Sequence, residues 1–520
     1  MYHAHMDTVT RYIDTRELDG SRPAFSRTVV TGIAPGGGLF VPENLPSFTL
    51  EEIVALSELP YWQRAAIVFG RFGVDLGDEH VETLMREAYG DQWDDERIAP
   101  VVEVVAGTHV LELWHGPTSA FKDMALQCMP LFFSAAVEKM QAEGSLTDDF
   151  LILVATSGDT GKAALEGFAD REHTSIVVFY PDGGVSDIQR LQMATQRGGN
   201  VGVFGVRGNF DDCQSAVKAA FSDDAFATRL HEQHGLRLSS ANSINWGRLL
   251  PQIVYYVSAY ADMVAAGGVK PGSLMDVCVP TGNFGNILGA YYARRMGVPI
   301  GRLLCASNEN NVLTDFIATG TYDISDRAFV TTPSPSMDIL VSSNLERLLY
   351  HLAGPEAVRG WMAELATSRR FTVDRETFAA VRELFFADWA SNDESLATIK
   401  RVYDEYGYLM DPHTAVAWEV AERLHGEDPV LVVSTAHWAK FGADVYRALT
   451  ATAYDAPLAD DAARMSGLEL LAEVQRIAPS AGPVPAPLAE IACLELRFSD
   501  VVDAGRDGVE GAVSEWLTRS

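Results

Sequence analysis

The chain has 520 residues, of which 47% are hydrophobic, and a mean hydropathy of +0.02. This composition supplies material for large buried cores, and the length predicts roughly two to four domains. There are 40 Lys and Arg against 71 Asp and Glu, a net charge of −31. Such a surface repels nucleic acid and anionic membranes, so neither is an expected partner, and a bound anion must meet local donors.

The cysteines are widely spaced, with no Cys-x-x-Cys pair that would indicate a metal or redox site. We therefore expect reduced thiols, no metal centre and a cytoplasmic location. The N-terminus has no apolar segment typical of a secretory signal. The longest apolar stretch, 249–268, contains Pro251, Gln252 and Asp262 and is predicted to be a buried helix rather than a membrane span. Monomer and homodimer both fit the sequence.

In chain order, residues 1–98 mix short apolar runs with Gly- and Pro-rich turns, followed by helical stretches at 50–57 and 60–71. From about residue 100, short apolar runs alternate with longer helical patterns. Residues 340–425 are mainly helical, and the stretch from 455 looks like a small appended segment with a terminal amphipathic helix. The predicted strands lie at 101–105, 111–114, 149–155, 175–180, 201–206, 275–280, 303–307 and 429–434, and predicted helices lie near 122, 186–196, 211–231, 244–265 and 286.

Continuous apolar strands of four to seven residues, separated by helices, are typical of parallel sheets covered on both faces. The sequence therefore predicts an α/β protein. Binding sites in such folds lie at the carboxyl ends of the strands, where four loops of this sequence fall.

The first loop is ATSGDTGKAAL, residues 155–165. Its Gly-Lys pair resembles a nucleotide-binding P-loop, but Gly158 and Gly161 have the wrong spacing and Ala163 replaces the magnesium-binding hydroxyl. One interpretation is a capped strand-to-helix turn. The other is that Ser157, Asp159, Thr160 and the helix N-terminus bind a polar or anionic ligand.

The second loop is VPTGNFGNILGAYYA, residues 279–293, which also joins an apolar strand to a helix. Glycines at 282 and 285 let successive backbone N–H groups point at one anion, so the loop is a candidate phosphate cradle. Phe284 argues against a plain hairpin turn.

The third loop, VVSTAHWAKF, covers residues 432–441. Its Ser-Thr pair either caps the next helix or places the Thr435 hydroxyl on a ligand nitrogen. His437, beside Trp438, is either a base or a packed side chain, and packing is the commoner role.

The fourth loop, HGPTSAFKDMALQ at 115–127, places Lys122 beside apolar residues at the start of a helix. Both surroundings disfavour an ammonium ion, and an uncharged lysine amine is a nucleophile for aldehydes. Pyridoxal phosphate requires such a lysine, a phosphate cradle and a partner for its ring nitrogen. Lys122, the 282–286 loop and Thr435 supply the three. Asp123 is interpreted as a carboxylate that caps the helix start.

These residues resemble the threonine synthase family, fold-type-II pyridoxal-phosphate enzymes related to the tryptophan synthase β subunit. The resemblance covers almost the full length, and the ANSINWGR block is its most specific part. The matching stretches are 15–43, 115–127, 155–165, 238–256, 280–286 and 434–441.

The resemblance implies a large and a small domain of parallel sheets flanked by helices, an N-terminal domain and a short C-terminal extension. The expected parts are an N-terminal domain at 1–98, the large domain at 99–150 and 238–454, the small domain at 151–237, and a C-terminal segment at 455–520. The resemblance also implies the cofactor pyridoxal 5'-phosphate and the residues that bind it. Lys122 forms the Schiff base, and the Thr435 hydroxyl meets the ring nitrogen. The cofactor phosphate is bound by Gly282, Asn283, Phe284, Gly285 and Asn286.

The implied reaction converts O-phospho-L-homoserine and water to L-threonine and phosphate, with Lys122 as the catalytic acid and base. The alternatives are a related phospho-lyase that releases 2-oxobutyrate and, from another class, a P-loop nucleotide-binding protein. We expect Asn242, Asn245 and Arg248 to share one helix face. The full set of predicted substrate-binding residues is Ser157, Asp159, Thr160, Lys162, Asn242, Asn245 and Arg248.

Overall fold

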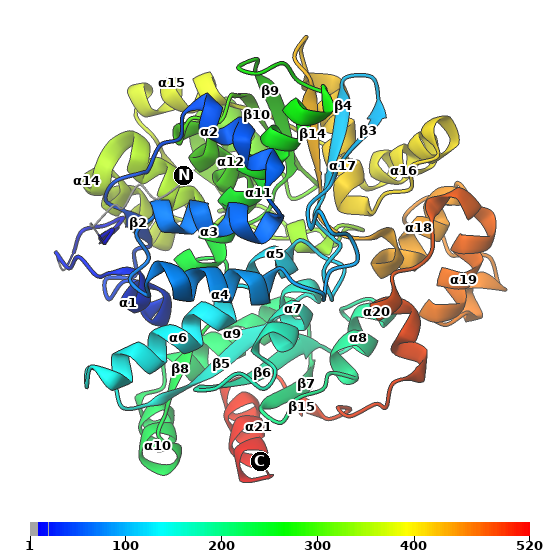
Figure 1. Ribbon diagram of the computed structural model, residues 1–520. Helices are drawn as coiled ribbons and strands as arrows, with labels where there is room; N and C mark the ends of the chain where they lie inside the picture. The colour runs from blue at the N-terminus through cyan, green and yellow to red at the C-terminus, as the bar shows by residue number, and fades with distance from the viewer. Residues whose placement is uncertain (1–8, 19, 520) are drawn as a thin grey trace.

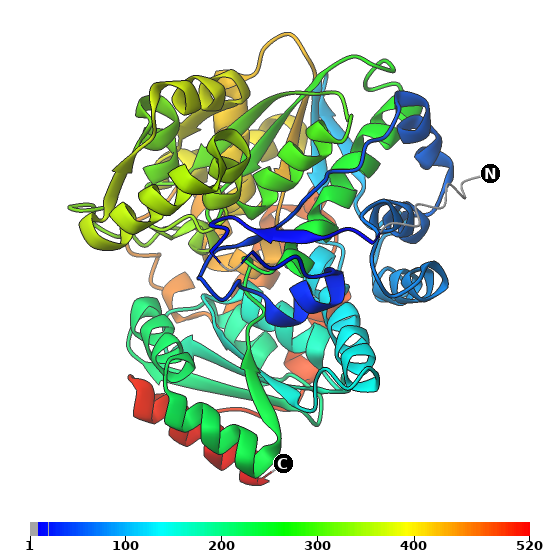
Figure 2. The same ribbon diagram turned by 90° about the vertical axis from the view of Figure 1, so that its left-hand side faces the viewer.

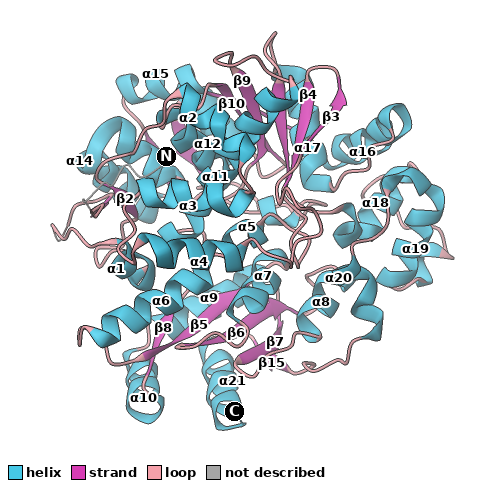
Figure 3. Cartoon of the chain, viewed as in Figure 1, coloured by secondary structure: helices cyan, strands magenta, loops and turns pink. Residues whose placement is uncertain are grey.

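Two β-sheets, each covered by helices, organise the chain (Figures 1 and 3). The computed structural model describes residues 9–18 and 20–519. The predicted α/β class with parallel sheets is confirmed. No helix among the described residues is long and apolar enough to cross a membrane.

The larger sheet has six strands in the order β13-β10-β9-β14-β4-β3, and β3 alone is antiparallel to its neighbour. Its apolar runs are buried on both faces: Val277 and Val279 belong to one core, whereas Cys278 between them belongs to the other. Alternation of side chains along a strand therefore explains the uninterrupted apolar pattern. The strands are β3 (Val101–Val105), β4 (Thr108–Glu112), β9 (Met275–Pro280), β10 (Ile300–Ser307), β13 (Phe385–Trp389) and β14 (Val430–Ser434).

The smaller sheet has five parallel strands in the order β15-β7-β6-β5-β8. Leu151 and Leu153 face one core, and Phe150 and Ile152 face the other. The strands are β5 (Asp149–Ala155), β6 (Thr174–Pro181), β7 (Val201–Arg207), β8 (Leu236–Ser239) and β15 (Val501–Asp503).

The C-terminal residues are part of this smaller sheet, whereas the sequence suggested an appended segment. Strand β15 pairs with β7, and α21 (Arg506–Arg519) buries Val509 and Val513 in the same core. Figure 2 shows α21 beside α10 (Asp224–His234), and Arg229 of α10 pairs with Glu510 at 2.8 Å. A three-residue strand carries too weak a pattern to be predicted alone.

Helices fill the space between and around the sheets. The predicted helix at 211–231 is two helices, because Asp223 caps a new start at Asp224. The N-terminal part holds β1 (Tyr12–Asp14), β2 (Phe40–Pro42), α1 (Phe25–Thr31), α2 (Leu50–Ala55), α3 (Tyr61–Arg71) and α4 (Asp78–Ala88). The helices nearest the site are α5 (Lys122–Leu126), α7 (Asp159–Phe168), α8 (Asp187–Ala194), α11 (Trp246–Ala266), α12 (Gly285–Arg295), α14 (Leu345–Ser368) and α17 (Pro412–Leu424).

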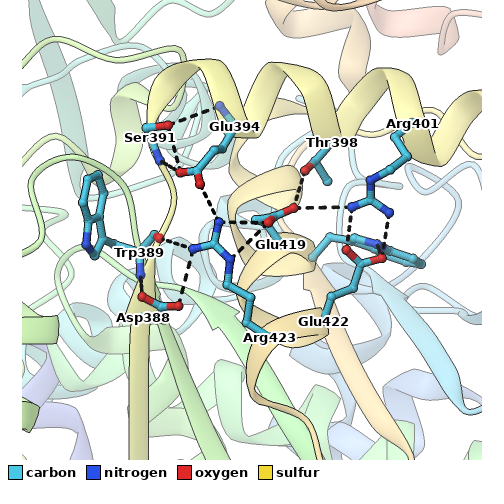
Figure 4. A network of polar contacts seen from close by, with 10 residues as sticks. Asp388, Trp389, Ser391, Glu394, Thr398, Arg401, Glu419, Glu422 and Arg423 are labelled. Carbon is cyan, nitrogen blue, oxygen red and sulfur yellow. Dashed lines mark hydrogen bonds and ion pairs between the residues drawn. The ribbon is translucent and has the colours of Figure 1, made fainter.

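A network of charged side chains braces edge strand β13 against α17 and the helix α16 (Asn392–Tyr406), as Figure 4 shows. Arg423 pairs with Glu394 at 2.7 Å and donates to the Trp389 carbonyl at 3.0 Å. Because its members share partners, this network orders the outer edge of the larger sheet more than separate surface pairs would.

Candidate active site

A cavity lies at the carboxyl ends of β9 and β14. Loops that are distant in sequence meet there, as expected for a parallel sheet. It is lined by Phe121, Lys122, Ser243, Arg248, Gln252, Pro280, Thr281, Gly282, Asn283, Phe284, Gly285, Asn286, Ser336, Met337, His413 and Thr435.

The loop that carries Lys122 is bonded to the loop that carries Thr435. The Phe121 N–H donates to the Thr435 carbonyl at 2.7 Å, and the His437 N–H donates to the Ser119 carbonyl at 3.1 Å. These backbone bonds fix the lysine and the threonine on one wall of the cavity.

Asp123 shapes the turn before Lys122 and does not cap the helix start, contrary to expectation. Its carboxylate accepts the Thr118 N–H at 2.8 Å and the Thr118 hydroxyl at 2.6 Å. Gly116 lies directly beneath it, where a Cβ would come within 2.6 Å of the Asp123 side chain. Glycine is therefore required at 116 by space.

The environment of Lys122 favours the neutral amine. Burial is the main cause, Arg248 and Lys440 add repulsion, and Asp159 opposes them, so that the pKa falls to about 7. The lowered pKa agrees with the prediction from the sequence, which did not anticipate the two cationic neighbours. An amine with this pKa holds and releases protons near neutral pH.

The glycine loop between β9 and α12 is open toward the cavity. Phe284 adopts the left-handed conformation, with φ of 62°, at the start of α12. None of the backbone N–H groups of residues 282–286 has a hydrogen-bond partner among the residues that the structure describes. Asn286 accepts from Tyr255 at 2.6 Å and from Tyr256 at 2.5 Å, and its buried Nδ2 is unpartnered within the same part of the chain. The loop thus supplies donors for an anion.

The Arg248 guanidinium supplies a second set of hydrogen-bond donors at the same cavity. It is 2% exposed, and burial lowers the pKa of its guanidinium. Its Nη1 donates to the Ala241 carbonyl at 2.5 Å, Nε has no partner, and no carboxylate pairs with it anywhere in residues 9–18 and 20–519. A buried guanidinium with unused donors is suited to bind an anionic group.

The loop after β5 does not reach the cavity lining. Asp159 pairs with the fully buried Lys440 at 2.9 Å and accepts from Ser336 and Gln189. The Lys162 ammonium pairs with Glu166 at 2.8 Å. Ser157 and Thr160, both partly buried, are likewise outside the lining.

The shared helix face predicted for Asn242, Asn245 and Arg248 is wrong. Helix α11 begins at Trp246, because Asn245 accepts the Gly247 N–H at 2.9 Å and ends the extended segment. The Asn245 amide also donates to the Val29 carbonyl at 2.8 Å. Asn242 is exposed. Only Arg248 of the three lines the cavity.

Several lining residues were missed by sequence reasoning: Ser243, Gln252, Ser336, Met337 and His413. Ser243 lies inside the specific ANSINWGR block, and this was an available signal. His413 gave none, because its position depends on Asp411, which bonds its Nδ1 at 2.7 Å, and on Ser336, whose N–H donates to Nε2 at 3.1 Å. His437 is a packed side chain: burial lowers its pKa to about 3.

These residues fit pyridoxal phosphate on their own chemistry. A partly buried lysine of low pKa, a run of N–H groups with no partner among the described residues and the Thr435 hydroxyl share one cavity. The fold and the site define a pyridoxal-phosphate-dependent enzyme.

Comparison with known proteins gives the family. Residues 11–89 match the threonine synthase N terminus, 108–436 match the pyridoxal-phosphate-dependent enzymes, and 414–512 match the threonine synthase C-terminal family. The chain belongs to the threonine synthase family. The P-loop alternative is wrong, because residues 155–165 fall inside the matched pyridoxal-phosphate region.

Relatives and solved structures agree. The chain is 39% identical to a threonine synthase of Pseudomonas aeruginosa, covering 84% of this chain and 90% of that protein. It is 43% identical to human threonine synthase-like 1, over 82% of this chain but only 58% of that protein. The structure of pyridoxal-phosphate-bound threonine synthase from Brucella melitensis superimposes with a TM-score of 0.83 at 36% identity, covering 98% of this chain and 99% of that one.

Proposed function

We propose that the protein converts O-phospho-L-homoserine and water to L-threonine and inorganic phosphate. The observation that carries this proposal is Arg248, a buried guanidinium that faces the cavity of a pyridoxal-phosphate enzyme without a carboxylate partner among the described residues. A phosphorylated substrate supplies the missing negative charge.

The cofactor would be held by Lys122, by the N–H groups of residues 282–286 and by the Thr435 hydroxyl. When bound, pyridoxal phosphate supplies an electron sink for negative charge that develops on the substrate carbon skeleton. The Thr435 hydroxyl would partner the ring nitrogen, and because it is neutral it would not hold a proton there as a carboxylate would.

Lys122 is the proposed proton carrier. Its amine is partly desolvated and has a pKa of about 7, so it would take a proton from substrate carbon and return it without a large energetic penalty at neutral pH. Arg248 lies close enough to lower that pKa, so a phosphate bound to Arg248 partly cancels this repulsion. Substrate binding would therefore raise the basicity of Lys122 when the base is needed.

The substrate phosphate would be held by Arg248 with Ser243, both of which line the cavity. As phosphate leaves, its oxygens gain negative charge, and a buried guanidinium stabilises that charge more than it stabilises the ester. Asn242, Ser157, Thr160 and Lys162 contribute to this role only in another conformation, because none lines the cavity here.

A phospho-lyase that releases 2-oxobutyrate is the second candidate. Four relatives named threonine synthase-like 1 are 42–44% identical to this chain, and four named threonine synthase are 34–39% identical. The two reactions share every step up to the loss of phosphate, so only the product separates them.

The test is to incubate the pyridoxal-phosphate-loaded protein with O-phospho-L-homoserine and to quantify threonine, 2-oxobutyrate and phosphate. Threonine equal to phosphate supports the proposal, and 2-oxobutyrate equal to phosphate supports the lyase. Lys122→Ala should lower phosphate release by at least about a thousandfold. Lys400→Ala, at a lysine that is paired with Asp404 on the surface, is the matched control and should remain active. Absence of phosphate release by the unaltered protein would contradict both candidates.

A further inference from the structure

The segment Ser342–Asn344, just before α14, lies behind the glycine loop and binds its carbonyl groups. The Ser342 hydroxyl donates to the Gly282 carbonyl at 2.6 Å. The Asn344 backbone N–H and its side-chain Nδ2 both donate to the Asn283 carbonyl, each at 3.1 Å. Two consecutive carbonyls of the loop are therefore turned toward this segment.

The direction of these carbonyls determines the direction of the neighbouring N–H groups. In a planar trans peptide, the carbonyl of one residue and the N–H of the next point in opposite directions. With the carbonyls of Gly282 and Asn283 bound from behind, the N–H groups of Asn283 and Phe284 point the other way, toward the cavity that both residues line. The glycines of the loop allow its N–H groups to point toward the cavity, but they do not by themselves determine that direction.

The same Asn344 amide also reaches the second loop of the cavity. Its Nδ2 donates to the Ser243 carbonyl at 3.2 Å as well as to Asn283. One amide group thus ties the backbone that carries Ser243 to the backbone of the glycine loop.

Arg347 fixes the orientation of that amide. Its Nη1 donates to the Asn344 Oδ1, and its Nη2 donates to the Ile244 carbonyl at 2.5 Å. A guanidinium has donors only, so it holds the Oδ1 toward itself and the Nδ2 toward the two loops. Arg347 is 0% exposed and donates from Nε to the Phe40 carbonyl at 2.9 Å, so the N-terminal part of the chain anchors it.

We propose that Asn344, oriented by Arg347, is a positioning residue that aims the N–H groups of the glycine loop at the cofactor phosphate and sets their distance from Ser243. The part of this inference that concerns the cofactor phosphate depends only on the glycine loop. The part that concerns Ser243 rests on the proposed function. Asn344 touches neither ligand, because it does not line the cavity.

The test is Asn344→Asp, which keeps the shape and the acceptor for Arg347 but loses both Nδ2 donations. The affinity of the cofactor-stripped protein for pyridoxal phosphate is compared with that for pyridoxal, which lacks the phosphate. We expect pyridoxal phosphate to bind about tenfold or more weakly, since carbonyl oxygens then face a carboxylate, whereas pyridoxal changes less than about twofold. Equal loss for both ligands, or no loss, would overturn the proposal.

The matched control is Asn200→Asp on the smaller sheet. The Asn200 amide also donates to backbone carbonyls, at 2.9 Å and 2.8 Å with a third at 3.5 Å, and its oxygen accepts one backbone N–H. It should lower thermal stability to a similar degree and leave the ratio of the two affinities unchanged; a matching drop in that ratio would overturn the proposal.

Ser342→Ala, which removes only the bond to Gly282, gives an independent result if Asn344→Asp does not fold. It should weaken pyridoxal phosphate about three- to tenfold and leave pyridoxal unaffected, and unchanged binding of pyridoxal phosphate would again contradict the inference. These measurements need no substrate, so they decide the part that concerns the cofactor phosphate even if O-phospho-L-homoserine is not converted.

Discussion

Two turns of the molecule have the same sequence pattern: an apolar strand, a loop with two glycines spaced by three, and a helix. They differ in whether the backbone N–H groups of the loop have hydrogen-bond partners. After β9, the N–H groups of residues 282–286 have no hydrogen-bond partner in the described part of the chain. After β5, the Thr156 hydroxyl accepts the Gly158 N–H at 3.0 Å and the Gly161 N–H at 2.8 Å, and Asp159 is occupied by Lys440.

The difference lies in what surrounds each loop rather than in its glycines. The open loop has its carbonyls bound from behind by Ser342 and Asn344, whereas the closed loop has its N–H groups bound from within by Thr156. A glycine pattern at a helix start is therefore evidence for a turn, and partner groups elsewhere in the chain decide whether that turn binds an anion.

The largest expected effect comes from breaking the closed loop at Lys440. Lys440→Met leaves the buried Asp159 carboxylate without its partner, so the free energy of unfolding should fall by about 3 kcal/mol or more in chemical denaturation. The double variant with Asp159→Asn removes the isolated charge and should recover much of the loss. A single variant as stable as the unaltered protein would show that the pair does not hold this loop.

The next largest effect is on substrate binding, where Arg248 at the cavity is compared with Lys162 of the β5 loop. Arg248→Gln should raise the KM for O-phospho-L-homoserine roughly 30- to 100-fold, because a buried charge-assisted contact to the phosphate is lost. Lys162→Gln should change it less than about twofold, since Lys162 is paired with Glu166. Steady-state kinetics measures both KM values. A larger increase for Lys162→Gln than for Arg248→Gln would show that the β5 loop, and not Arg248, binds the substrate phosphate.

Thr156→Val tests whether closure of the β5 turn matters for stability alone. The variant leaves two buried N–H groups without their acceptor and should lower the free energy of unfolding by about 1 to 2 kcal/mol. Affinity for pyridoxal phosphate should remain within about twofold. A gain in phosphate binding by this variant would mean that the closed turn is a second cradle held shut.

The last effect concerns pH and His115, the first residue of the Lys122 loop. Burial lowers its pKa, but bonds to Asp94 at 2.5 Å and Glu112 at 3.0 Å outweigh burial and raise the pKa to about 9. A raised pKa stabilises the fold fully below about pH 6.5 and loses that contribution as pH rises to about 9. His115→Gln should therefore flatten the decline of the free energy of unfolding over this window, as urea unfolding at a series of pH values would show. An unchanged slope would show that His115 does not cause the decline.

Sequence reasoning located the residues whose role depends on local pattern. Lys122, Gly282, Gly285 and Thr435 each follow a recognisable strand, and the structure brings them to one cavity. It failed where a side chain has a partner that is remote in sequence. Nothing near Asn245 predicts its bond to Val29, and nothing near the β5 loop predicts Lys440.

The chain order of the larger sheet has a consequence for how the protein is made. Strand β14, synthesised late, is inserted between β9 and β4, and the Thr435 carbonyl then receives the Phe121 N–H. Until residues 430–435 leave the ribosome, the early strands β3 and β4 are not joined to β9 and β10, and their apolar edges lack partners. Chains stalled before that point would carry Lys122 but no assembled pocket, so retention of the cofactor reports that synthesis has passed the central strand.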